Sequence, residues 1–81
     1  MATKTDLQDW VTEALRSLGG RAPLVEVAKF IWKNHERSLM ASGNLFFTWQ
    51  YDMRWAANQL RRKSIMKAAD ASPVGIWELS A

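Results

Sequence analysis

The sequence predicts a single small α+β domain in which three main helices precede a C-terminal β-hairpin. Apolar residues recur at helical spacing in three separate stretches, and two short segments separated by turn-forming residues follow them. The 81 residues suit one domain, and their 48% apolar content supplies the core that such a short chain needs. We expect this domain to span residues 1–81, with residues 1–5 as a flexible tail.

The first helix is expected from about Asp6 to Leu18. Thr5 and Gln8 have the spacing of a capping box at its start. The Gly19-Gly20 pair predicts its end, because glycine readily adopts the left-handed conformation that closes many helices. The apolar residues of this segment form one stripe, made of Leu7, Trp10, Val11, Ala14, Leu15 and Leu18.

A short strand at Arg21-Ala22 should lead into the second helix, because the residue before Pro23 disfavours helical conformation. Pro23 suits the first turn of that helix. We expect the helix to end near Asn34 or His35. Its apolar stripe consists of Leu24, Val27, Ala28, Ile31 and Trp32.

The segment between the second and third helices, residues 35–47, predicts a long connecting loop. Ser42-Gly43-Asn44 is a turn signal, but the flanking leucines, methionine and phenylalanines are too apolar for a solvated loop. We therefore expect a lid that folds back on the core, with a short helix near residues 37–41.

The third helix is expected from Trp49 to about Lys63, with Thr48 as its N-cap. Two strands should follow, over residues 65–69 and 75–79, and the turn formers between them predict an antiparallel hairpin. The apolar face of the helix consists of Trp49, Met53, Ala56, Ala57 and Leu60.

This order of elements, α-β-α-α-β-β, is that of a small winged helix-turn-helix domain. The third helix would be the recognition helix and the hairpin would be the wing. Large apolar side chains should fill the core, so four of the five tryptophans are expected there: Trp10, Trp32, Trp49 and Trp77.

The net charge of +3 resides entirely in the last third of the chain. Residues 1–53 contain six basic and six acidic side chains, whereas residues 54–81 contain five basic and two acidic ones. A basic helix that leads into a hairpin is typical of a small nucleic-acid-binding domain. The sequence thus favours double-stranded DNA as the partner.

The chain also resembles the N-terminal domain of Mrr-type restriction endonucleases over about residues 7–80. That family has a tryptophan at the start of its third helix, an Arg-Trp-Ala triplet, a leucine followed by two basic residues, and a Gly-aliphatic-Trp closing strand. The corresponding residues here are Trp49, Arg54-Trp55-Ala56, Leu60-Arg61-Arg62 and Gly75-Ile76-Trp77.

The resemblance implies a winged-helix fold and DNA binding, without the nuclease, which is a separate C-terminal domain in that family. A restriction-like recognition role or a small transcription regulator would fit. Two positions depart from the family pattern. Ser64 stands where the family usually has glycine, and residues 72–74 lack the basic residue that is common there.

The candidate DNA-binding residues lie on the polar side of the third helix and just beyond it. Arginine matches the acceptors of guanine, and asparagine those of adenine, so Gln50, Tyr51, Arg54 and Asn58 are assigned to the major groove. Arg61, Arg62 and Lys67 would neutralise phosphates. The aromatic rings of Tyr51 and Trp55 could stack on a base or pack against the protein.

Other constellations have simpler interpretations. Lys29, Lys33 and Arg37 could touch the DNA backbone or form a solvated face. The acidic residues at the start of the first helix compensate its dipole. Cysteine is absent and His35 is alone, so we expect no metal site, no cofactor and no enzyme activity, with His35 at the surface near a helix C-terminus.

An alternative function is a protein-interaction or dimerisation module that uses the apolar segment Leu39–Phe47. The two functions differ in the surface that they need. Protein interaction needs an exposed apolar patch of Leu39, Leu45 and Phe46, whereas DNA binding needs an exposed basic face on the third helix. A homodimer or partner protein would also help so small a domain to reach useful DNA specificity. The polar N-terminus is unlike a signal peptide, so a cytoplasmic, nucleoid-associated location is expected.

Overall fold

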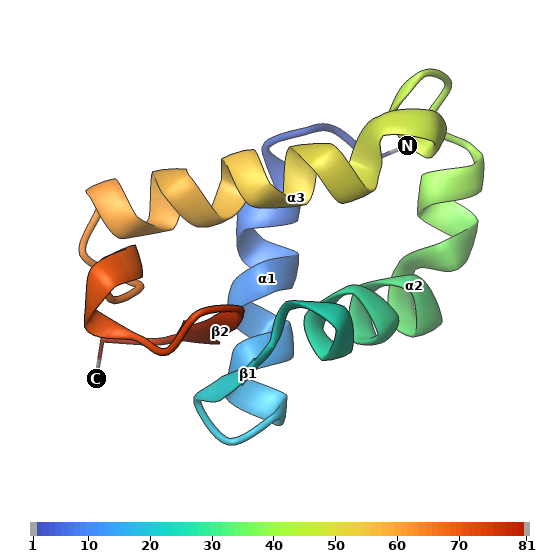
Figure 1. The fold of residues 1–81 in the computed structure, drawn as a ribbon. Helices are drawn as coiled ribbons and strands as arrows, with labels where there is room; N and C mark the ends of the chain where they lie inside the picture. The colour runs from blue at the N-terminus through green and yellow to red at the C-terminus, as the bar shows by residue number, and fades with distance from the viewer. Residues whose placement is uncertain (1, 81) are drawn as a thin grey trace.

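The computed structural model describes residues 2–80 and shows a small α+β fold with three helices and a two-stranded antiparallel sheet (Figure 1). None of the helices in this range combines the length and apolarity needed to cross a membrane. The elements in chain order are α1 (Asp6–Ser17), β1 (Arg21–Pro23), α2 (Leu24–Met40), α3 (Leu45–Arg62), a 3₁₀ turn η1 (Ala69–Ala71) and β2 (Ile76–Glu78).

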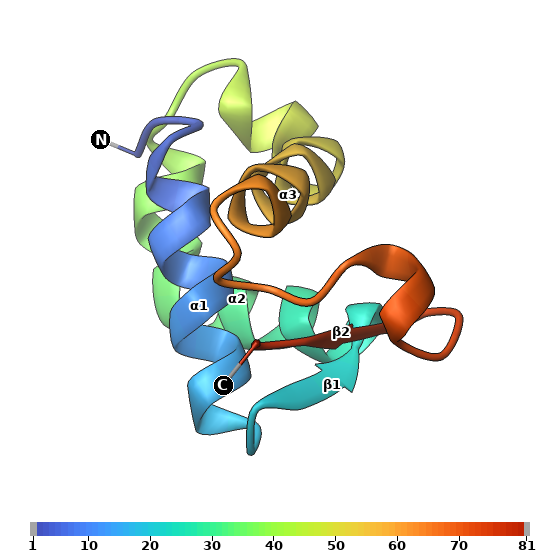
Figure 2. The same ribbon diagram turned by 90° about the vertical axis from the view of Figure 1, so that its left-hand side faces the viewer.

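The three helices surround one core, with α1 behind α3 and the first half of α2 in Figure 1. The α2 and α3 helices run in roughly opposite directions, and the sheet lies below the C-terminal end of α3. A view turned by 90° shows the sheet below α3, with the strand ends beside the lower part of α1 (Figure 2). The most extensive helix contact is between α1 and α3.

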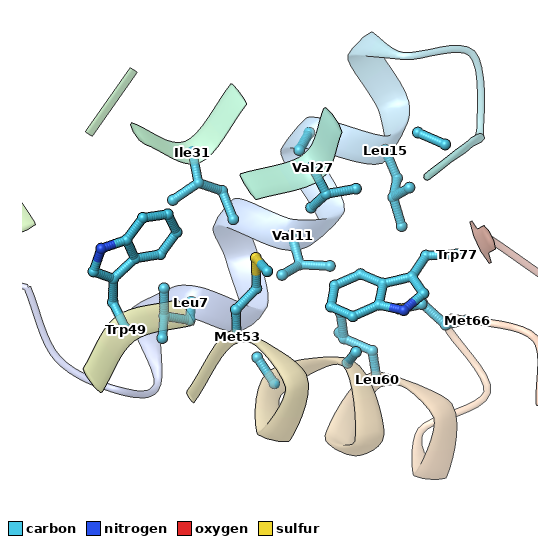
Figure 3. Packing of buried hydrophobic residues seen from close by; sticks show 14 of the residues in the cluster. Leu7, Val11, Leu15, Val27, Ile31, Trp49, Met53, Leu60, Met66 and Trp77 are labelled. Carbon is cyan, nitrogen blue, oxygen red and sulfur yellow. The ribbon is translucent and has the colours of Figure 1, made fainter. Parts of the chain in front are cut away.

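The core contains the apolar faces that the sequence predicts for the three helices, except at Leu18, which lies just beyond α1 and is exposed. In Figure 3, Trp49 and Trp77 lie at the two ends of the cluster, with Val11 and Met53 between them. Both tryptophans are buried, whereas Trp10 and Trp32 are half-buried and pack against the cluster. The inner residues of α3 are buried as expected: Trp49, Met53, Ala56, Ala57 and Leu60.

The α1 and α3 helices end in the same hydrogen-bonded motif, built on different residues. The N–H of Gly20 donates to the Leu15 carbonyl (2.7 Å), and the N–H of Ile65 donates to the Leu60 carbonyl (2.9 Å). These are the six-to-one bonds of a Schellman motif. Its left-handed residue is Gly19 (φ 89°) in α1 but Ser64 (φ 61°) in α3. Ser64 thus adopts the conformation that glycine favours.

The expected capping box at the start of α1 is wrong. Thr5 has helical backbone angles and its hydroxyl makes no capping bond. The carboxylate of Asp6 accepts from the Thr3 N–H instead (2.9 Å). The Gln8 side chain reaches across to α3, where its Oε1 accepts from Lys63 Nζ (2.7 Å). The Gln8 side chain therefore links α1 to the end of α3 and does not cap α1.

Residues 2–5, expected as a flexible tail, lie against the domain, and Met1 is outside the described residues. Ala2 is buried and its N–H donates to the Ser42 hydroxyl (3.0 Å). Lys4 Nζ lies 4.3 Å from the centre of the Trp55 ring. This segment is thus attached to the α2–α3 connection at Ser42 and to α3 at Trp55.

The long loop expected between the second and third helices is not found. The α2 helix continues to Met40, with non-helical angles at His35 (φ −129°, ψ 18°) where the first helical part was expected to end. The expected short helix is the second part of α2, and only residues 41–44 connect it to α3. Gly43, in the predicted turn, has a positive φ of 61°. The apolar residues extend the helices instead of forming a lid.

The N-cap predicted for α3 is also wrong, because the helix begins four residues before Trp49, at Leu45. Thr48 lies inside the helix, and its hydroxyl donates to the Asp52 carboxylate (2.8 Å). Threonine is a good cap at a helix start, but it is tolerated inside a helix when its hydroxyl finds a local partner.

The sheet pairs β1 with β2, with Ala22 opposite Trp77. The expected strand over residues 65–69 reduces to a single antiparallel bridge between Met66 and Leu79. The Lys67 N–H donates to the Glu78 carbonyl (3.0 Å), and the chain then enters η1. Alanines fill this stretch, and alanine has little preference for extended structure.

Candidate nucleic-acid interface

The outward face of α3 carries the polar residues that the sequence assigns to the groove. The inward face holds α3 against α1 and the core, so the opposite face is turned to solvent. Gln50, Tyr51, Arg54 and Asn58 are all exposed. The described salt bridges do not include Arg54. Gln50, Tyr51 and Arg54 are therefore free to meet a ligand.

Phe47 belongs to the same face, although the sequence predicted it in the apolar connecting segment Leu39–Phe47 and not among the groove residues. Its side chain is 82% exposed. The predicted helix began at Trp49, which placed Phe47 in a loop, whereas α3 begins at Leu45. Positions 47, 51, 54 and 58 have the spacing of one helical stripe. Extending the pattern backward past Thr48 would have found this residue.

The basic residues at the end of α3 differ in exposure and in their bonds to the rest of the protein. Arg62 is exposed and has no salt bridge within residues 2–80. Arg61 is half-buried, and it donates to the Lys67 carbonyl and to Asn58 Oδ1, both at 3.3 Å. These bonds hold both Arg61 and Asn58 in place. Arg62 is the freer cation of the pair.

Lys67 is paired with a carboxylate rather than free. Its Nζ lies 3.3 Å from Glu78 Oε2. The pKa of Glu78 is lowered, chiefly by the Ser72 hydroxyl and also by Lys67, while burial acts in the opposite direction. Because Ser72 Oγ has no partner of good hydrogen-bond geometry among the described residues, the contact with Lys67 is the better defined. Lys67 would have to leave Glu78, or share it, to neutralise a phosphate.

Trp55 packs against the core and is half-buried. The cation of Lys4 covers its ring, which is a favourable cation–π arrangement. Packing, rather than exposure for base stacking, is therefore the observed state of Trp55. Tyr51, by contrast, is 76% exposed.

The three basic residues of α2 do not form one continuous line. The break in helical geometry at His35 separates Arg37 from Lys29 and Lys33. Lys29 also lies 3.4 Å from Glu26. The four-residue spacing seen in the sequence is thus interrupted where the second half of α2 changes direction (Figure 1).

His35 has a structural role at that bend. Its ring stacks on Trp10, with 3.9 Å between ring centres and an interplanar angle of 7°. Its Nε2 lies 2.8 Å from Glu13 Oε1. The side chain is only 20% exposed, so the expectation of an ordinary surface residue is wrong. Within residues 2–80 no group of three His, Asp or Glu residues could hold a metal ion.

A groove separates α2 from the first half of α3. It has a volume of about 630 Å³ and opens to solvent. Its lining comes from two stretches of helix that are distant in the sequence: Leu24, Val25, Ala28, Lys29 and Trp32 of α2, and Phe46, Trp49, Gln50, Met53 and Arg54 of α3. Arg54 and Gln50 thus belong both to this groove and to the outward face of α3.

The apolar patch considered for the alternative function is mostly inside the protein. Leu39 is fully buried, and Leu45 packs partly buried against the core. Phe46 is half-buried and contacts Trp32, with 6.3 Å between ring centres. Two other apolar residues of the segment Leu39–Phe47, Met40 and Phe47, are exposed. The basic face of α3 is exposed as well, and Phe47 lies on it.

Comparison with known proteins adds nothing to these observations. No protein-family model matches the chain, and neither does any curated protein or solved structure.

Proposed function

We propose that this chain is a DNA-binding winged-helix domain whose α3 enters the major groove of double-stranded DNA. The element order supports the proposal: α1, β1, α2 and α3 precede a segment whose Met66 forms an antiparallel bridge with Leu79, the residue after β2. In this interpretation α2 and α3 form the helix-turn-helix pair, and residues 67–75 form a short wing.

The observation that carries the proposal is the composition of the exposed face of α3. Arg54 has the donors that match guanine O6 and N7, and Gln50 and Asn58 have amides suited to adenine. The exposed ring of Phe47 suits contact with a thymine methyl group. A face built only for solubility would not need an exposed phenylalanine and tyrosine among its polar residues.

The basic end of α3 would hold the phosphate backbone. Arg62 is free to do so, and Arg61 is positioned by its bonds to Lys67 and Asn58. Lys63 lies at the C-cap, where its Nζ donates to Gln8 Oε1. Residues near the end of a recognition helix usually meet the backbone. In this proposal the phosphate contacts would lie beside the groove contacts.

The resemblance to the N-terminal domain of Mrr-type restriction endonucleases supports the same function. The position where that family usually has glycine is Ser64, and Ser64 has the positive φ that glycine favours. We propose a recognition role in a restriction-like system or in transcription regulation, in the cytoplasm and without enzyme activity of its own. A dimer or a partner subunit would extend the few bases that one copy can read.

An NMR amide titration with a short mixed-sequence duplex, at about 50 and then 200 mM salt, tests the proposal. We expect shifts at residues 47–62, with log Kd changing with log salt by a slope of magnitude about 3.6 for roughly four neutralised phosphates. The absence of any shift at the lower salt concentration would refute DNA binding.

Two variants of equal charge sharpen this test. Arg54→Ala should weaken binding by about 5- to 150-fold, the usual cost of losing a bidentate base contact. Arg16→Ala, at the exposed end of α1 away from α3 (Figure 1), should leave the affinity nearly unchanged. Equal losses from both variants would indicate attraction by net charge alone.

A further inference from the structure

We propose that the groove between α2 and α3 binds an acidic amphipathic helix of a partner protein. The groove extends over about two turns of each helix, from Leu24 to Trp32 on one wall and from Phe46 to Arg54 on the other. Eight residues of helix rise about 12 Å. A partner helix of three to four turns, about 16–22 Å long, would cover this length and extend beyond its ends, which is the helix-in-groove mode of recognition.

The floor of the groove is apolar and aromatic. Trp32 and Trp49 stack with 6.0 Å between ring centres, and Met53 and Ala28 line the space beside them. Val25 stands at the edge and is 59% exposed although it is apolar. Such a surface has little to offer a phosphate or a base edge. It suits leucine-like side chains spaced three or four residues apart.

Charge selects the kind of partner. The groove is lined by two cations, Lys29 from α2 and Arg54 from α3, and by no carboxylate. Glu26 offsets Lys29 in part, whereas Arg54 has no salt bridge within residues 2–80. Since the cations lie on opposite walls above an apolar floor, they complement a helix with apolar anchors and acidic flanks.

The same helix would regulate DNA binding. This part of the inference rests on the proposed function, because Gln50 and Arg54 line the groove and also belong to the face assigned to the DNA major groove. A partner seated in the groove would cover both side chains. It would therefore compete with DNA for the protein.

A titration of the ¹⁵N-labelled chain with a synthetic peptide tests the groove without DNA. The peptide has about 14 residues, with leucines at helical spacing i, i+4, i+7 and i+11 and glutamates elsewhere. One control replaces the glutamates with lysines and another replaces the leucines with serines. We expect shifts at Val25, Lys29, Trp32 and Gln50, and binding at least about tenfold tighter than for either control.

Variants locate the binding site. Lys29→Ala and Arg54→Ala should each weaken peptide binding about fivefold, whereas Lys33→Ala, an exposed lysine outside the groove, should not. Val25→Glu puts a carboxylate into the groove at an exposed position and should abolish binding while leaving the amide spectrum of the fold intact.

The outcomes separate this inference from the proposed function. Equal binding of the lysine peptide, no binding at millimolar peptide, or self-association of the chain through groove residues would overturn the acidic-helix inference. Peptide binding without DNA binding would support the groove and refute the proposed function. If both ligands bind, the acidic peptide should displace the duplex, and simultaneous binding would overturn the competition.

Discussion

The α3 helix meets its two helical neighbours in different ways. Against α1 it packs closely, through fully buried residues that include the small side chains Ala56 and Ala57. Against α2 it leaves a groove, where Trp32 and Phe46 stand half-buried between the helices. The separation of two packed helices depends on the side chains at their contact. Small residues are among the fully buried ones of α3, and aromatic residues line the groove between α3 and α2.

The difference separates stability from function within one helix. The closed side fixes the position of α3 on the core. The open side and the outward face offer the exposed groups Gln50 and Arg54 to ligands. Variants on the two sides should therefore have effects of very different size.

The largest expected effect comes from deleting a side chain on the closed side. Leu7→Ala removes a fully buried leucine of α1 and should lower the free energy of unfolding by about 2–5 kcal/mol. Leu24→Ala, at the half-buried edge of the groove, should cost about 1 kcal/mol because solvent already reaches it. Urea unfolding measures the stability of both variants. Similar losses of stability for Leu7→Ala and Leu24→Ala would contradict the division into closed and open sides.

Adding volume should also destabilise the closed side more than the open side. Ala57→Leu inserts three carbons where no space exists and should destabilise the protein by about 1–3 kcal/mol. Ala28→Leu extends into the groove and should change stability by less than about 0.5 kcal/mol. Thermal melting curves of the two variants test this difference. A loss of stability for Ala28→Leu equal to that for Ala57→Leu would mean that the groove has no room for a larger side chain.

A smaller change in stability is expected at the C-terminal ends of α1 and α3, the two closely packed helices. Ser64→Gly should stabilise the protein by about 1 kcal/mol, because serine pays for its left-handed conformation and glycine does not. Gly19→Ser, at the equivalent position of α1, should destabilise it by a similar amount. Chemical denaturation tests the pair, and a destabilised Ser64→Gly variant would show that the serine side chain makes a compensating contact.

The smallest effect is expected at Glu78, away from both faces of α3. Its folded pKa is below the ordinary value of 4.5, so its stabilising contribution is present above that pH. This contribution is lost as the pH falls through the lowered folded pKa. Glu78→Gln should therefore be less stable than the original chain at pH 7 and equal to it near pH 2. A stability difference that stays constant across this pH range would exclude the charge of Glu78 as its source.

Much of the helical structure was predictable because each helix buries one stripe of apolar residues. The inner residues Trp49, Met53 and Leu60 were identified by spacing alone and are all buried. The break near His35 and the turn at Gly43 were also visible as local signals. The start of α3 was wrong because the cap preference of Thr48 was given more weight than the periodicity that continues through Phe47.

The sequence by itself determined which residues face inward and where the chain turns, since helical periodicity and glycine conformation act over a few residues. Only the tertiary structure decided how distant segments meet. Pairing β2 with β1 rather than in a full hairpin, and joining Lys67 to Glu78, depend on where the core places each segment. The groove between α2 and α3 has the same origin, because its width depends on side chains from two helices that touch only after folding.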